Sequence, residues 1–330
     1  MIFTEAGGDD KPPGKGKRNG QGMPITYDAV KALSADLYDW SLRAVPADTK
    51  DGLRRALETE TQDGARKVLR MMLGSAQKAE EEDRFVCSDA GVPVYHVTIG
   101  SAARLDGDIK AAISDGFDEL VARIKPPLLK HVTNPLTNER GYKGRDMPLV
   151  TWDVAGGADW VEILCQPKAL GSGRWAALET FSFPTLAEIE AYVMKVVMQA
   201  GSQHCPPVII GVGIGGSFDV AARIASKATM RRVGSVNDEP VLAAMEARLL
   251  QAMNATGVGP RAAMEERLLR AVNATGFGPM GTGGDTTALA VHVDYASGHG
   301  YTPVAVCFNC WINRRTRARL HADGSVERFE

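Results

Sequence analysis

The sequence lacks a long apolar run: its best one, residues 208–214, already contains two glycines. Because a membrane-spanning helix needs about 18 or more apolar residues, we expect no membrane segment. The chain also lacks an excess of positive charge, since 38 lysines and arginines stand against 40 acidic residues in a total of 330. A nucleic-acid surface must neutralise phosphates, so we expect no nucleic-acid partner.

Cysteine is scarce as well, with five residues, an odd number, spread over the chain. Small proteins built on disulfides are dense in cysteine, so this pattern predicts free thiols in a reducing cytoplasm. The N-terminal segment lacks the apolar stretch of a signal peptide, because charges and glycines interrupt it. We expect residues 1–25 to form a disordered polar tail.

The spacing of apolar residues predicts helices first and a strand–helix mixture later. From Tyr27 to Glu82 the spacing is helical, with breaks near Pro46 and at Asp63. Further helices are expected at residues 107–124, 186–200 and from the glycines after 212 to Met230. Strands are expected at residues 92–99, 149–154, 160–165, 208–212, 291–295 and 303–309. This order predicts an α/β (mixed α+β) fold, with an N-terminal helical region followed by a mixed sheet with flanking helices.

One segment occurs twice. Residues 245–260 recur nineteen positions later as residues 264–279, with few changes. Two copies are too few for a solenoid, so residues 245–263 are interpreted as a tandem-duplicated insert at the surface. The second copy is continuous with Gly278-Pro-Met280 and is expected to hold the original position in the fold.

Taken one at a time, the cysteines are ambiguous. Cys87 lies between the helical region and a strand, and Cys205 precedes two prolines; each position suits a ligand or a small buried side chain. Cys307 and Cys310 form a C-x-x-C pair, which is typical of redox and zinc sites. The pair ends a strand, however, and no second pair completes four zinc ligands. Cys165 and Cys307 are expected to be core residues.

Glycine-rich segments let a backbone approach a ligand or another backbone closely. Gly211, Gly213 and Gly216 follow a strand with the G-x-G-x-x-G spacing of a dinucleotide-binding turn. The acidic residue Asp238 follows a loop pattern rather than a second strand, so a carboxylate would suit this turn as well as a pyrophosphate. A nucleotide-binding oxidoreductase that uses Gly211–Gly216 therefore stays open as an alternative function.

Five longer motifs stand in one order along the chain. They are Cys87-Ser-Asp-Ala-Gly91, His204-Cys-Pro-Pro207, the glycine strand at 208–216, Gly278-Pro-Met-Gly-x-Gly-Gly284, and Cys310-x-x-x-Arg314-Arg315. Together they resemble the cluster-binding region of class I fumarases and, equally, the alpha subunit of L-tartrate dehydratase. The resemblance runs from about Tyr27 to the last residue and implies that residues 26–330 form an iron–sulfur hydro-lyase catalytic domain.

The resemblance implies a [4Fe-4S] cluster bound by Cys87, Cys205 and Cys310, with one thiolate on each of three irons. The fourth iron would have no protein ligand and would act as a Lewis acid on a small hydroxy-dicarboxylate such as malate or tartrate. In the family's C-Q-D-T-G motif the acid matches Asp89, which is therefore the candidate for proton handling. Reversible hydration and dehydration is the implied reaction.

The loops that meet substrate in the family differ most in this chain. Ser88 replaces the family's glutamine, and the loop that usually reads G-G-G-S-E-N after Pro-Lys keeps only Lys168, Gly171 and Ser172. These four residues are the predicted substrate contacts, while the identity of the hydroxy acid stays open.

The resemblance covers only the first half of single-chain class I fumarases, whose second domain contributes substrate-binding groups. It therefore implies a separate beta subunit and a hetero-oligomer. A non-catalytic relative that still carries the cluster is the other alternative.

Overall fold

The computed structural model describes residues 23–255 and 277–329. The expected polar tail lies outside the described residues except for its last three members. Of these, Ile25 is 2% exposed and begins strand β1 (Ile25–Thr26), which pairs with β3 (Leu105–Asp106). The folded part thus begins slightly earlier than predicted. No helix in the described ranges is long and apolar enough to cross a membrane.

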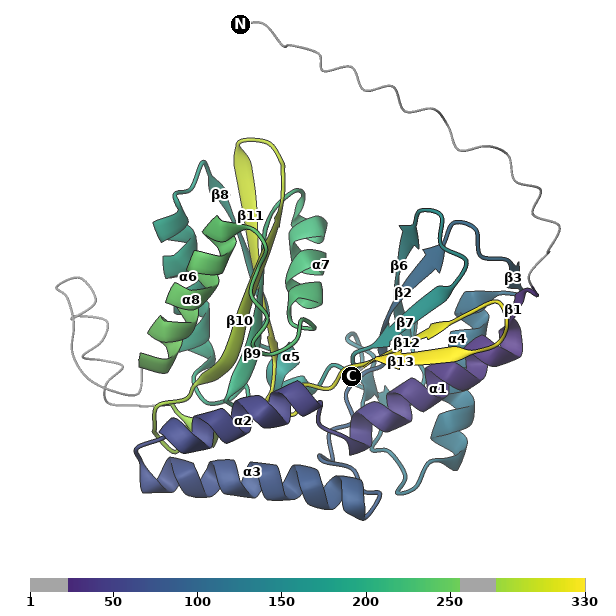
Figure 1. Cartoon of the computed structure of the whole chain (residues 1–330), viewed down its shortest axis with the longest axis horizontal. Helices are drawn as coiled ribbons and strands as arrows, with labels where there is room; N and C mark the ends of the chain where they lie inside the picture. Colours follow the sequence, from purple (N-terminus) through teal and green to yellow (C-terminus); the bar gives the residue numbers. More distant parts are fainter. Residues whose placement is uncertain (1–22, 256–276, 330) are drawn as a thin grey trace, which may run out of the picture.

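Three helices open the chain, as the apolar spacing predicted: α1 (Tyr27–Arg43), α2 (Ala47–Thr59) and α3 (Asp63–Glu81). The hydroxyl of Thr26 caps α1 by accepting from the N–H of Ala29 at 3.2 Å. The molecule has two lobes that each contain a sheet, and helices α2 and α3 run along its base, mainly beneath the lobe that contains β8 to β11 (Figure 1).

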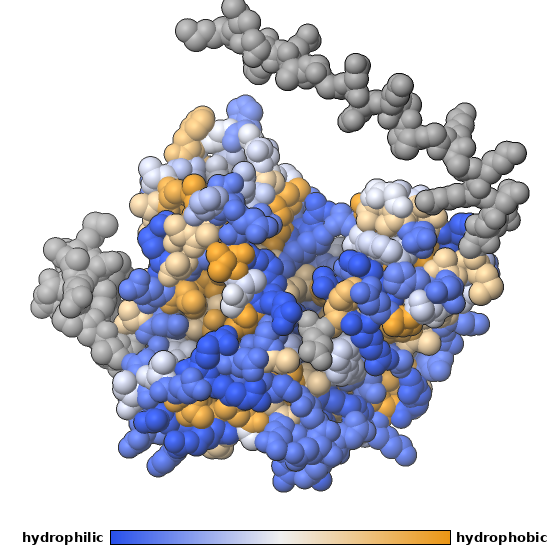
Figure 2. All heavy atoms as spheres, in the orientation of Figure 1, coloured by the Kyte–Doolittle hydropathy of each residue, from blue (hydrophilic) through white to orange (hydrophobic). Residues whose placement is uncertain are grey.

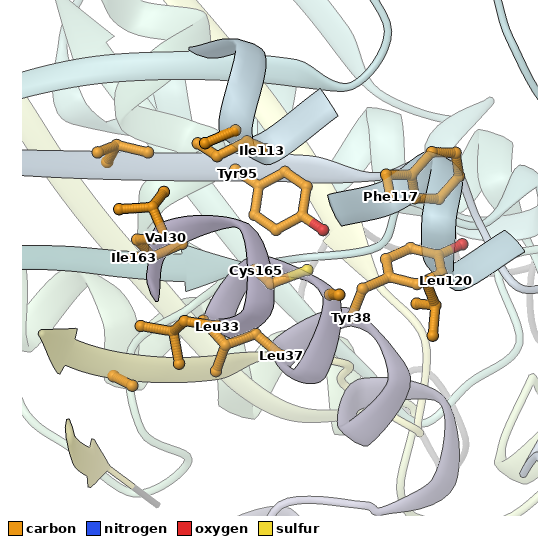
Figure 3. Close-up of a cluster of buried hydrophobic side chains, with 14 of the residues drawn as sticks. Val30, Leu33, Leu37, Tyr38, Tyr95, Ile113, Phe117, Leu120, Ile163 and Cys165 are labelled. Carbon is orange, nitrogen blue, oxygen red and sulfur yellow. The ribbon is translucent and has the colours of Figure 1, made fainter. Parts of the chain in front are cut away.

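The first lobe contains a five-stranded sheet in the order β13-β12-β7-β2-β6, in which only β2 and β6 are parallel. Helices α1 and α4 (Ile109–Arg123) cover one face. Figure 3 shows the core between them, where Tyr38 and Phe117 pack edge to face and Cys165 is fully buried, as predicted for that cysteine. The strands are β2 (Val94–Gly100), β6 (Leu149–Ala155), β7 (Val161–Cys165), β12 (Thr316–Leu320) and β13 (Val326–Phe329).

The second lobe contains a four-stranded sheet in the order β10-β9-β11-β8. Helices α6 (Leu186–Ala200) and α8 (Pro240–Ala255) cover one face, and α7 (Phe218–Ala228) covers the face that is turned toward the first lobe (Figure 1). The strands are β8 (Ala177–Ser182), β9 (Val208–Gly215), β10 (Ala288–Ala296) and β11 (Tyr301–Asn309). The short elements are β4 (Val132–Thr133), β5 (Arg140–Gly141), α5 (Leu170–Gly173) and the 3-10 turn η1 (Pro279–Gly281). The mixed architecture confirms the predicted fold class.

The glycines of the apparent dinucleotide motif serve helix packing. Gly211 and Gly213 lie inside β9 rather than in the turn after it. A Cβ atom at either position would lie 2.1 Å from a carbonyl oxygen of α7, Ala225 for Gly211 and Ala221 for Gly213. The α7 backbone therefore occupies the space beside these glycines, and the nucleotide-binding alternative loses its structural basis.

The first copy of the repeat is part of the core, so the expectation of a surface insert is wrong for residues 245–255. Met245, Leu249 and Met253 of α8 are at most 1% exposed and pack in the second lobe's core. The side chain of Asn254 accepts from the N–H of Ala288 at 2.8 Å, which fixes the start of β10. The apolar residues recur every four positions and so form one face of the helix. Residues 256–276, with most of the second copy, lie outside the described residues.

Asp48 in the first turn of α2 contacts both lobes. Its Oδ2 accepts from the backbone N–H of Val233 at 2.6 Å, beyond α7 in the second lobe. The same oxygen accepts from the Arg315 guanidinium at 2.5 Å, just before β12 in the first lobe. Asp48 is 8% exposed, so this is a buried junction between the lobes.

Candidate functional site

Three loops bring the three predicted cluster cysteines together. Cys87 follows α3, Cys205 lies between α6 and β9, and Cys310 follows β11; all three are half-buried free thiols. Burial, with the neighbouring Cys310 and Cys87 thiols, raises the pKa of Cys205 to about 11. The N–H of Trp311 donates to the Cys205 carbonyl at 3.3 Å and so joins two of the loops. Residues 223 positions apart in the sequence thus meet in one site.

The backbone of Cys205 is strained. Its φ is +59°, a left-handed value that residues other than glycine rarely adopt. The conformation is held in place because the Cys205 N–H donates to the Ser202 carbonyl at 3.3 Å and the Met280 N–H donates to the Pro206 carbonyl at 2.9 Å. Such strain is concentrated at functional sites, where the surrounding structure compensates for its cost.

A buried arginine stands beside the thiols. Burial raises the pKa of Cys310, while the positive charge of Arg314 lowers it. Arg314 is 4% exposed, and its Nε and Nη2 atoms are buried without a hydrogen-bond partner in the part of the chain that the structure describes. A buried guanidinium that lacks partners is costly, and a negatively charged group in the site would offset that cost. Sequence reasoning assigned Arg314 no role.

This donor set fits the iron–sulfur ligation that the resemblance implies. In residues 23–255 and 277–329, no three His, Cys, Asp or Glu side chains converge on a point where one metal ion could bind. A four-iron cluster has no such requirement, because each thiolate binds its own iron. Protonated thiols must release protons on binding iron, and the nearby Arg314 charge favours that release.

Asp89 links the Cys87 loop to α5. One carboxylate oxygen accepts from the Gly91 N–H at 3.0 Å, and the other accepts from the Leu170 N–H at 2.8 Å. Ser88, next in the chain to Cys87, is exposed. The structure therefore gives Asp89 an organising role, and its role in proton handling stays a prediction.

The other predicted substrate contacts surround α5. A Cβ atom at Gly171 would lie 3.5 Å from the Cys205 sulfur, so this glycine leaves room beside a thiol. Ser172 is 3% exposed. The ammonium of Lys168 donates to the Phe308 carbonyl and, at 3.1 Å, to the Asn309 side chain, and burial lowers its pKa. Lys168 therefore holds the end of β11, directly before Cys310, with its donors facing protein acceptors.

His204, next to Cys205, is another residue that the sequence did not single out for chemistry. Its ring is fully buried and stacks on Phe308 with centroids 5.1 Å apart, and neither ring nitrogen has a hydrogen-bond partner among the described residues. Burial lowers its pKa to about 4, so the ring is neutral at physiological pH. Only its place in the H-C-P-P motif could have drawn attention to it.

Comparison with known proteins agrees with these motifs. A model of the fumarate hydratase (fumerase) family matches residues 32–262 and 260–319, so its two matched segments meet inside the duplicated region. The putative L(+)-tartrate dehydratase subunit alpha of Methanocaldococcus jannaschii is 30% identical over 269 residues, which cover 78% of this chain and 86% of that protein. The L(+)-tartrate dehydratase subunit alpha of Escherichia coli K12 is also 30% identical over 269 residues, covering 79% of this chain and 80% of that protein. The chain therefore belongs to the fumarate hydratase (fumerase) family.

Proposed function

We propose that this protein is the alpha subunit of an iron–sulfur hydro-lyase that reversibly hydrates or dehydrates a small hydroxy-dicarboxylate. The observation that carries the proposal is the meeting of three free, half-buried cysteines beside the buried guanidinium of Arg314, two of whose nitrogens have no hydrogen-bond partner among the described residues. Membership of the family and the names of the similar relatives support it. Fumarate or malate and tartrate are the first substrates to test.

In this proposal Cys87, Cys205 and Cys310 hold a [4Fe-4S] cluster. When bound, the cluster supplies an open iron as a Lewis acid for the substrate hydroxyl. Arg314 favours the thiolate form of Cys310, because its charge lies beside that thiol and, among the described residues, no group accepts from two of its nitrogens.

The surrounding residues position the loops and the substrate. Asp89 fixes the Cys87 loop against α5 and is the candidate acceptor for the proton from the carbon next to the hydroxyl. Ser88 offers an exposed hydroxyl to a substrate carboxylate, and Gly171 leaves space next to Cys205. Lys168 keeps the end of β11 in place, so its effect on substrate acts through Cys310.

A beta subunit completes the enzyme in this proposal. The relatives are named as alpha subunits, which supports a hetero-oligomer with a second chain. We place the enzyme in the reducing cytoplasm, where all five cysteines stay free.

The test is a cysteine series on protein that is purified without oxygen and reconstituted with iron and sulfide. Cys87→Ser, Cys205→Ser and Cys310→Ser should each deplete iron, sulfide and the visible absorbance. Cys165→Ala and Cys307→Ala are matched controls, since Cys165 is core and Cys307 packs against α7. Iron content that is unchanged in all three serine variants contradicts the proposed ligands.

Activity is measured separately with the co-expressed beta subunit. Dehydration of malate or tartrate that depends on both chains supports the hydro-lyase. Full iron content without any dehydration in that complex favours the alternative of a non-catalytic relative.

A further inference from the structure

A cavity of about 320 Å³ lies between the two lobes. One wall is the face of the first sheet that α1 and α4 leave uncovered, and the other is the C-terminal end of α7 with the residues after it. Figure 2 shows the molecule hollowed between the lobes, with hydrophilic residues on the walls. None of the five cysteines and none of the predicted substrate contacts lines this cavity. Its volume falls in the range of small-molecule sites.

Positive charge dominates the walls. The cavity is lined by one acidic and five basic side chains, which are Glu162, Lys227, Arg231, Arg232, Arg315 and Arg317. Three of the cations have acidic partners that do not line the cavity: Asp153 for Lys227, Glu246 for Arg231 and Asp48 for Arg315. Arg317 also lies 3.9 Å from Glu162 in the cavity wall, so four of the five cations have an acidic partner, while five of the six charged side chains that line the cavity are positive.

Among the residues that the structure describes, one donor of Arg315 has no acceptor. The Arg315 side chain is 8% exposed, and one end of the guanidinium donates to Asp48 at 2.5 Å. The other end, Nη1, is buried and has no hydrogen-bond partner in residues 23–255 and 277–329. An oxygen of a carboxylate or phosphate at Nη1 would satisfy it with a charge-assisted hydrogen bond. A cavity-lining arginine with an unsatisfied donor, among other cationic side chains, points to an anionic ligand.

His96 also lines the cavity, from strand β2. Its Nδ1 lies 2.6 Å from the Thr151 hydroxyl, and its other ring nitrogen is buried near the Gln166 side chain. Burial, with the charge of Lys227, lowers the pKa of His96 to about 4, so the ring adds no positive charge to the wall at neutral pH.

We propose that this cavity binds a small molecule through a phosphate or carboxylate group, with Arg315 as its central contact and Arg317 and Lys227 beside it. Leu164, Met230 and Phe329 also line the cavity and give an apolar surface for the rest of the molecule. The ligand bridges the lobes, because α7 packs on the sheet of the second lobe and β12 is a strand of the first. The site is separate from the three cysteines and does not depend on the proposed reaction.

The test is calorimetric titration of the full chain with inorganic phosphate and, separately, with succinate, at ionic strength held constant with chloride. Arg315→Lys keeps a positive charge beside Asp48 but removes the second donor group of the guanidinium. Arg317→Gln removes one of the positive charges that line the cavity. The matched control is Arg319→Gln, which lies on the same strand and also pairs with Glu162 but does not line the cavity.

Both lining variants should weaken binding at least tenfold, about 1.4 kcal/mol, while Arg319→Gln should leave it unchanged. Preference for phosphate or for succinate identifies the group that the site takes. The result should be the same in a Cys87→Ser background, because no cysteine lines the cavity. The proposal is overturned if neither anion binds saturably, if Arg315→Lys binds as the wild type does, or if binding is lost with Cys87→Ser.

Discussion

Leu249 gives the sharpest test of which copy of the repeat builds the second lobe. Its side chain is 1% exposed and packs in the core that α8 shares with the four-stranded sheet. Replacing a buried leucine by alanine removes transfer free energy and leaves a cavity, at a cost of about 2–5 kcal/mol. We expect Leu249→Ala to lower the free energy of unfolding by ~3 kcal/mol, measured by urea denaturation followed by circular dichroism.

The repeat supplies its own control, because Leu268 stands nineteen positions later in the same sequence context. Leu268→Ala and the double variant are measured beside Leu249→Ala. The assignment of α8 to the first copy is refuted if Leu268→Ala causes the whole loss. It also fails if neither single change matters and only the double variant is destabilised, since the two copies would then substitute for each other.

Three further predictions follow from other contacts. Gly213→Ala should destabilise the protein by about 1–3 kcal/mol or more, because its Cβ would meet the α7 backbone; Gly156→Ala, with no atom within 4 Å, is the control in the same urea assay. Burial lowers the pKa of His292 to about 4, so as the pH falls the unfolded chain binds a proton at this residue before the folded protein does. The contribution of His292 to the free energy of unfolding should be complete above pH 6.5 and should be lost toward pH 4. His292→Gln should therefore flatten this part of a curve of stability against pH by up to ~3 kcal/mol. Asp89→Asn should reduce the amount of iron that the protein retains after reconstitution, because one of the two backbone amides that donate to Asp89 loses its acceptor. If the variant loses iron no faster than the wild type does, the organising role of Asp89 is contradicted.

Elements with a regular apolar pattern could be predicted from the sequence. The helix expected at 186–200 is α6 with the same bounds, because its apolar spacing and the Thr185–Glu188 capping box are both local signals. Strand β12 was missed, since arginines alternate with its buried residues and its pairing depends on β7, more than 150 residues earlier. Charged strands of this kind are set by partners that no local window contains.

Some features of the candidate site could likewise be predicted from the sequence, and others could not. The three cysteines could be selected from five because they stand in motifs that resemble a family, and the structure brings these three into one place. The hydrogen bond between Lys168 and Asn309 joins residues 141 positions apart, and the missing partners of Arg314 are a property of three-dimensional burial. Neither is visible in the order of residues, so the role predicted for Lys168 could only be refined, and a role for Arg314 only recognised, with the structure.

The Asp48 junction has a consequence for cooperativity. One buried oxygen accepts from both lobes, through Val233 and Arg315, so the lobes cannot separate without leaving an unpaired charge. Breaking a buried pair in this way is strongly unfavourable, so the first turn of α2 couples the two lobes. Heating should unfold both lobes in a single transition, and Asp48→Ala should divide that transition in two.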